Sequence, residues 1–190
     1  MKKISLGAVI LLGLALNACT APPVDDMNRA RDAVIRAEND ADAVAYAPNT
    51  LVRARDALVR MESEADAKRY DAAKNFAAEA ISNAEKAIAD GKTGLERARE
   101  EASRLINSLR DLLAETSAAI NAVRENNMQL DFNALSRDLD TARRTYDEAL
   151  QSFQANNFLD AIDKAQTVRS LLSSINVRMT ETAQAESRKQ

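Results

Sequence analysis

The stretch that decides the fold is AEKAIADGKTGLERA, residues 84–98. Small residues recur in it every three or four positions and so fall on one side of a helix: Ala84, Ala87, Gly91, Gly94 and Ala98. Two glycines usually indicate a turn, and each costs about 1 kcal/mol inside a helix. A loop would usually reset the register, yet here the register continues unbroken. We therefore predict one helix over residues 70–126, roughly 85 Å long at about 1.5 Å per residue.

Gly91 and Gly94 lie on the packing seam of this predicted helix. A glycine has no side chain, so it can admit the close approach of a neighbouring chain. It can also weaken the helix, so that the rod bends there as a hinge. The sequence alone leaves both roles open.

The same spacing of apolar residues extends through the rest of the chain. It predicts a first helix that starts near Met27 and ends at Ala47-Pro48-Asn49, because proline removes a backbone donor and constrains the residue before it. Further short breaks are expected at 68–69, 126–131 and 156–157, and short connections make consecutive helices antiparallel neighbours. The 190 residues include four Gly and three Pro, too few for the many turns of a β fold. We predict an all-α fold, an elongated antiparallel helical bundle with coiled-coil-like packing.

The two halves of the chain resemble each other. Residues 68–73, KRYDAA, parallel residues 156–161, NNFLDA, with an offset of 88. Residues 46–51 parallel residues 130–135 with an offset of 84, so the second hairpin is longer by about one helical turn. Chance similarity in alanine-rich sequence is the alternative explanation.

A duplication predicts two three-helix units that share the long central helix. We place the first unit at residues 25–90 and the second at residues 91–186, followed by a frayed tail at 187–190. The central helix crosses the boundary, so the two units are expected to form one stiff rod.

The first residues carry a separate signal. Two lysines precede an apolar run over residues 4–16, which is too short for an ordinary membrane-spanning helix. The run ends in Leu16-Asn17-Ala18-Cys19, which resembles the lipobox of bacterial lipoproteins. This resemblance implies removal of residues 1–18 and acylation of Cys19, the single cysteine of the chain. An ordinary secretory signal with a chance cysteine and a short uncleaved anchor are the alternatives.

The lipobox resemblance also implies a location. Two or more acyl chains hold a protein on a bilayer far better than one does. Residues 19–24 would form a short lipidated tether, stiffened by Pro22 and Pro23. Thr20 resembles the address that directs lipoproteins of enteric bacteria to the outer membrane. We therefore expect an outer-membrane lipoprotein of a diderm cell envelope, facing the periplasm.

Two motifs resemble a known family. Ala47-Pro48-Asn49-Thr50-Leu51 starts one predicted helix, and Tyr70-Asp71-Ala72-Ala73 follows a predicted hairpin. Together they make residues 28–90 similar to the short alanine-rich helical domain of unknown function found in many bacterial envelope lipoproteins, with hairpins of the tetratricopeptide kind. That family usually has Gly before the aromatic residue, where this chain has Arg69. The resemblance implies a helical fold and an envelope location, and it implies no activity.

The composition argues against catalysis. The chain has no histidine, so it lacks the usual general base near pH 7 and the imidazole metal ligand. Its one cysteine is expected to carry lipid, and it has no glycine-rich phosphate loop. The 26 Lys+Arg against 29 Asp+Glu give a net charge of −3, which argues against a nucleic acid partner. We predict no enzyme, no metal site, and no cofactor other than the covalent lipid on Cys19.

Aromatic residues near the predicted hairpins are the other candidates for a site: Tyr70, Tyr146, Phe153 and Phe158. They can pack the hairpin ends or line a groove. The main functional prediction is a structural or adaptor scaffold that binds another envelope protein, with self-association as a variant. The alternative is a periplasmic carrier or receptor that holds a peptide or an apolar ligand between helices. Small alanine seams leave little room for a ligand, which favours the adaptor.

Overall fold

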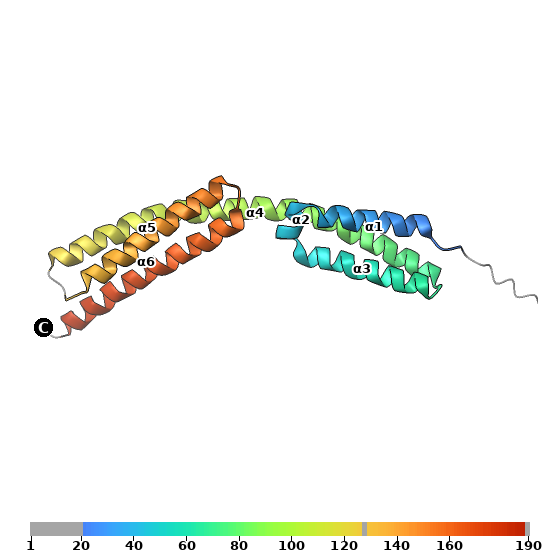
Figure 1. The fold of residues 1–190 in the computed structure, drawn as a ribbon. Coiled ribbons are helices and arrows are strands. Elements are labelled where there is room, and N and C mark those ends of the chain that lie inside the picture. Colours follow the sequence, from blue (N-terminus) through green and yellow to red (C-terminus); the bar gives the residue numbers. More distant parts are fainter. Residues whose placement is uncertain (1–20, 127–128, 189–190) are drawn as a thin grey trace, which may run out of the picture.

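The chain folds into an elongated all-α structure. The computed structural model describes residues 21–126 and 129–188, and within these ranges it contains helices and no strand. Figure 1 shows two helical bundles arranged end to end, with one long helix running through both. The helices are α1 (Val24–Glu38), α2 (Ala41–Tyr46), α3 (Pro48–Asp66), α4 (Tyr70–Glu125), α5 (Phe132–Gln154) and α6 (Phe158–Ser187).

Helix α4 is the spine of the molecule. It has 56 residues, so it is about 84 Å long at about 1.5 Å per residue. Its first half packs against α1, α2 and α3, and its second half packs against α5 and α6 (Figure 1). It stays helical through Gly91 and Gly94. The predicted all-α class and the predicted long central helix are confirmed.

The N-terminal part differs from the prediction of one first helix ending near Ala47. α1 ends at Glu38 and α2 begins at Ala41. The Asp40 side chain accepts a hydrogen bond from the backbone N–H of Ala43 at 2.8 Å and so caps the start of α2. The prediction of an unbroken first helix is wrong, because this cap supports a new helix start that the apolar spacing does not reveal. Among the described residues, the first unit therefore has four helical segments rather than three.

The two units have cores of different chemistry. The first core is built mainly from alanines, which let α1, α3 and α4 pack closely. The second core is built mainly from larger Leu, Ile, Val and Met side chains. A third, small cluster lies where the units meet: Ala98, Ala102, Phe158 and Ala161, with Tyr46 of α2 packed against them. Side chains from both units therefore share one buried cluster around the middle of α4.

The α3–α4 hairpin and the α5–α6 hairpin close in the same way. Lys68 and Asn156 adopt the left-handed conformation, with φ of 59° and 60°. The next residue in each hairpin, Arg69 or Asn157, donates its N–H to the carbonyl five positions back, at 2.9 Å in both cases. The two left-handed residues are 88 positions apart, which is the offset of the sequence repeat. α5 has 23 residues against 19 in α3, which accounts for the difference between the two offsets.

Candidate protein-binding site

Gly91 and Gly94 lie where α2 crosses α4. A Cβ placed on Gly91 would lie 2.5 Å from the backbone nitrogen of Ala43 and 2.6 Å from the carbonyl carbon of Asp42. A Cβ on Gly94 would lie 2.6 Å from the Cβ of Tyr46. Carbon atoms in contact normally stay about 3.5–4.0 Å apart, so the absence of a side chain is what lets α2 reach α4 here. Of the two roles considered for these glycines, the geometry fits the close approach of a neighbouring helix.

A polar cluster beside this crossing holds the start of α3 on α4. The buried hydroxyl of Thr50 donates to the Asp90 carboxylate at 3.1 Å and accepts from Arg53 at 2.9 Å. Lys86 donates to Asp90 at 3.0 Å. Lys86 first, and the Thr50 hydroxyl second, lower the pKa of the Asp90 carboxyl below its usual value. These groups satisfy one another, so the cluster fixes the fold of this region.

A matching cluster closes the α5–α6 hairpin. The buried Ser152 hydroxyl lies 2.5 Å from the Asp160 carboxylate and accepts from the Lys164 ammonium at 3.0 Å. Lys164 also donates to Asp160 at 2.5 Å. The hydrogen bond from Lys164, and after it the one from Ser152, lower the pKa of the Asp160 carboxyl. This cluster too has a structural task, since it ties the end of α5 to the start of α6.

Of the four aromatic residues named from the sequence, only Phe153 and Phe158 come together. Tyr146 is buried in the second core, and its hydroxyl has no hydrogen-bond partner among the described residues. Phe153 and Phe158 contact each other across the α5–α6 hairpin, with ring centroids 5.4 Å apart. Tyr70 begins α4 at the hairpin of the first unit. The four side chains therefore pack three separate parts of the molecule rather than line one groove.

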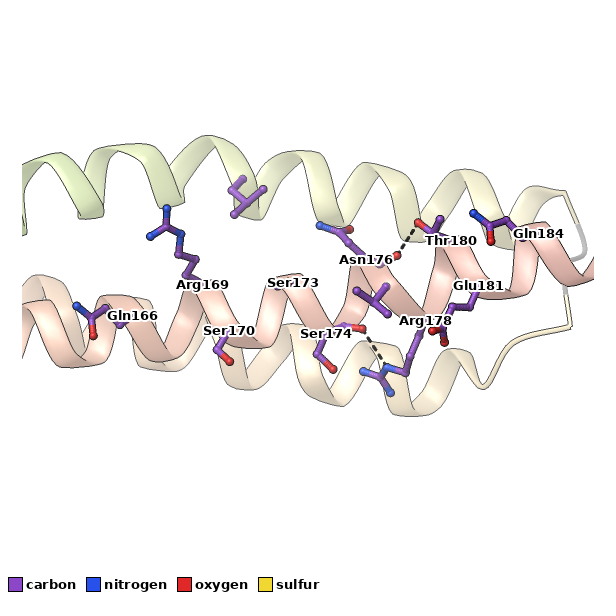
Figure 2. Close-up of a pocket in the computed structure, with 12 residues that line it drawn as sticks. Gln166, Arg169, Ser170, Ser173, Ser174, Asn176, Arg178, Thr180, Glu181 and Gln184 are labelled. Atoms are coloured by element: carbon purple, nitrogen blue, oxygen red, sulfur yellow. Dashed lines mark hydrogen bonds between the residues drawn. The ribbon is translucent and has the colours of Figure 1, made fainter.

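A groove of about 1010 Å³ runs along α6 in the second unit. One face of α6 lines it, together with Leu112 of α4. Figure 2 shows the lining residues spread between Gln166 at one end and Gln184 at the other. These two residues are 18 positions apart, so the groove is about 27 Å long at about 1.5 Å per residue. Most of its other lining side chains are short or uncharged: Ser170, Ser173, Ser174, Asn176, Val177 and Thr180.

Few charges lie in this groove. Arg169 and Glu181 line it, whereas the charge of Arg178 is paired with Asp138 of α5. Val177 has 51% of its surface exposed, so apolar area is available in the middle of a polar face. Protein interfaces combine an apolar centre with a polar rim in this way. The groove therefore suits a helix or an extended segment of another protein.

Sequence reasoning missed this face. Residues 165–177 contain a single charged residue, Arg169, although charged residues make up 29% of the whole chain. This low charge on an outward helix face is the signal that could have found the groove. The search for apolar spacing passes over it, because serine, asparagine and glutamine count as solvated positions in such a pattern.

Two further features concern residues 21–126 and 129–188, the part of the chain that the structure describes. In these ranges no group of three or more His, Cys, Asp or Glu is placed to hold a metal ion. None of the helices in these ranges combines the length and the apolar character that crossing a membrane requires. Cys19, the candidate for lipidation, lies outside the described residues.

Comparison with protein families bears on the first unit. Residues 25–103 match the model of a family described as a domain of unknown function, DUF4398. The match covers α1, α2, α3 and the first part of α4, and it includes the segment whose motifs indicated a domain of unknown function. The groove along α6 lies beyond it. Searches of curated proteins and of solved structures give no match to the chain. Residues 25–103 are thus similar to a family whose description assigns no function.

Proposed function

We propose that the chain is a non-catalytic lipoprotein of the bacterial cell envelope that acts as a helical scaffold and binds another envelope protein. The observation that carries this proposal is the groove along α6, with its short polar side chains, few charges and exposed Val177. A partner helix could lie along it for about five turns at about 5.4 Å per turn. The short serine side chains would let the partner's backbone approach, and Arg169 and Glu181 would favour one register.

The shape of the molecule supports a scaffold that reaches away from an anchored end. α1 begins at Val24, five positions after Cys19. Figure 1 shows that α1 starts at the end of the molecule far from α6. Leu112, in the groove, lies 42 positions along α4 from Tyr70, which corresponds to about 60 Å. A lipid anchor on Cys19 would therefore hold the groove about 60 Å along the rod from the membrane.

A carrier or receptor for a peptide or an apolar ligand is the second candidate. The volume of the α6 groove, about 1010 Å³, is sufficient for such a ligand. Ligand pockets, however, are lined mainly by apolar and aromatic side chains that bury most of the ligand. Of the side chains that line the groove only Leu112 and Val177 are apolar and none is aromatic, and Tyr146, Phe153 and Phe158 pack elsewhere. The adaptor is therefore the better supported of the two.

Photocrosslinking in cells tests the adaptor proposal. A photoreactive amino acid at Ser170, in the groove, is compared with the same amino acid at Ser82, the exposed serine 88 positions earlier on α4. We expect a discrete protein to be captured from Ser170 and not from Ser82. Ser173→Arg should abolish this capture, because a long charged side chain would fill the face. Capture of lipid or of a small molecule alone from Ser170 would refute the adaptor proposal.

Cys19→Ser tests the anchor separately. We expect the wild-type chain to fractionate with membranes and to carry the added mass of acyl chains, and we expect the variant to lose both properties. A wild-type chain without acyl mass would contradict the lipoprotein part of the proposal. The proposal that the chain binds another protein would still be decided by the crosslinking experiment at Ser170.

A further inference from the structure

A second surface, on the first unit, exposes apolar side chains between two ion pairs. Arg31 of α1 bonds Glu62 of α3 at 3.0 Å, and Glu38 of α1 bonds Arg55 of α3 at 2.6 Å. The helices are antiparallel, so the stretch of α1 between these pairs lies level with the stretch of α3 between them. Two exposed side chains occupy these stretches, Ile35 at 52% and Val59 at 65% exposure. We call this surface the α1–α3 face: Arg31, Ile35, Glu38, Arg55, Val59 and Glu62.

The charges of the α1–α3 face alternate. At one end the positive charge is on α1 and the negative charge on α3, and at the other end the order is reversed. All four charged side chains keep between 37% and 49% of their surface exposed, so they can contact a partner without losing their own ion pairs. The pattern is a two-by-two square of opposite charges around an apolar centre.

This square is complementary to itself. A two-fold axis that runs parallel to the helices, between two copies set face to face, places α1 of one copy over α3 of the other. Arg31 then faces Glu62 of the second copy, and Glu38 faces Arg55 of the second copy. Ile35 meets Val59 of the second copy, which removes two exposed apolar side chains per chain from water.

We propose that a second copy of this chain docks on the α1–α3 face, side by side and parallel. A protein of another kind would have to supply the same alternating square, whereas a second copy carries it already. The parallel direction rests on the proposed anchoring at Cys19, because it keeps both N-termini at the same end of the pair. The pairing itself uses only residues of the first unit and leaves the α6 groove free.

A charge swap of one ion pair tests the proposal. In Arg31→Glu/Glu62→Arg the pair within the chain is kept, with the charges exchanged. The parallel arrangement then predicts that the swapped chain pairs with itself as well as the wild type does. It also predicts that swapped and wild-type chains pair with each other about tenfold more weakly, because like charges face each other twice. Sedimentation equilibrium of the purified full-length chains in a density-matched mild detergent measures the three associations.

Each outcome of this experiment decides the proposal. An antiparallel pair would bring Arg31 over Glu38 of the second copy, so loss of self-pairing in the swapped chain overturns the parallel arrangement. Wild-type chains that stay monomeric at about 100 μM overturn the second copy as the occupant. Monomeric behaviour would not contradict the adaptor proposal, because that proposal is tested separately by photocrosslinking from Ser170.

A second pair of variants tests the apolar centre. Val59→Lys should abolish self-association, because it places an ammonium against the Ile35 side chain of the second copy. Leu159→Lys is the matched control, because Leu159 is 47% exposed but lies on α6 in the other unit. Equal association of the two variants, with helical content equal to the wild type by circular dichroism, would overturn the assignment of the α1–α3 face.

Discussion

Replacement of Gly91 by alanine sets two free-energy terms against each other. In an exposed position of a long helix, this change raises the free energy of unfolding by about 1 kcal/mol. In α4, however, the added Cβ would lie 2.5, 2.6 and 2.8 Å from three backbone atoms of Asp42 and Ala43. Rotation of a side chain cannot relieve contacts with a backbone, so α2 itself has to move.

The magnitude follows from the size of that movement. Carbon atoms in contact lie about 3.5–4.0 Å apart, so α2 has to withdraw by about 1 Å. Overpacking of this kind costs about 1–3 kcal/mol. The withdrawal also pulls Tyr46 from the cluster that both units share. With the gain in helix propensity of about 1 kcal/mol subtracted, we expect a net loss of up to about 2 kcal/mol. For a chain of this size the Tm then falls by up to about 8 °C.

Thermal and urea unfolding, followed by circular dichroism, measure this loss. Ala89→Gly is the control, because Ala89 is exposed in the same part of α4 and reports helix propensity alone. It should lower the free energy of unfolding by about 1 kcal/mol. A Gly91→Ala chain that melts at a higher temperature than the wild type would refute the close packing of α2 on Gly91, since propensity alone would then be acting.

Three further substitutions have predictable effects on stability. Asp160→Asn should destabilise the chain at pH 7, because the folded-state pKa of Asp160 is lowered and its carboxylate therefore stabilises the fold. This contribution is lost on protonation, so the difference in Tm between the variant and the wild type should vanish as the pH falls below about 4. Lys68→Gly should stabilise by about 1 kcal/mol in urea unfolding, and Asn156→Gly by less, because both residues are left-handed and Asn tolerates that conformation better than Lys. An equal gain at both would contradict this reasoning. Thr116→Val should raise the Tm by about 2–4 °C, because the buried Thr116 hydroxyl has no hydrogen-bond partner among the described residues, and an unchanged or lower Tm would show that the hydroxyl is satisfied.

The long helix could be predicted because its evidence is local. Small residues recur every three or four positions through Gly91 and Gly94, which can be read from consecutive positions alone, and α4 is helical through this stretch. The hairpin ends could be predicted for the same reason, since polar pairs at 68–69 and 156–157 interrupt the apolar spacing where the chain reverses. Apolar periodicity is the strongest secondary-structure signal in a sequence, and this chain has little else.

The break after α1 could not be predicted from that signal. The spacing of Ala37, Ala41 and Val44 continues across Asn39 and Asp40 as if the helix did, yet Val44 is 48% exposed. Asp40 can either cap a new helix or continue the first one. Which of the two it does depends on whether α2 gains contacts by turning toward Gly91. Those contacts are tertiary, so a pattern of consecutive residues does not contain them. The α1–α3 face was missed for the same reason, since it combines side chains from two helices. The α6 groove was missed for another reason, because its signal is low charge along one helix and not apolar spacing.

The sharing of α4 by both units has a mechanical consequence. Each residue of an α-helix turns the chain by about 100°, so the number of residues between two seam positions sets the angle between the bundles that pack on them. The alanines of the first core and those around Ala98 follow one register along α4, and the shared cluster with Tyr46 and Phe158 braces the junction. A flexible linker would let the two units turn independently. Here the angle between the α1–α3 face and the α6 groove is set by the number of α4 residues between the two bundles. A pair of chains joined at the α1–α3 face would therefore present its two α6 grooves in a defined direction.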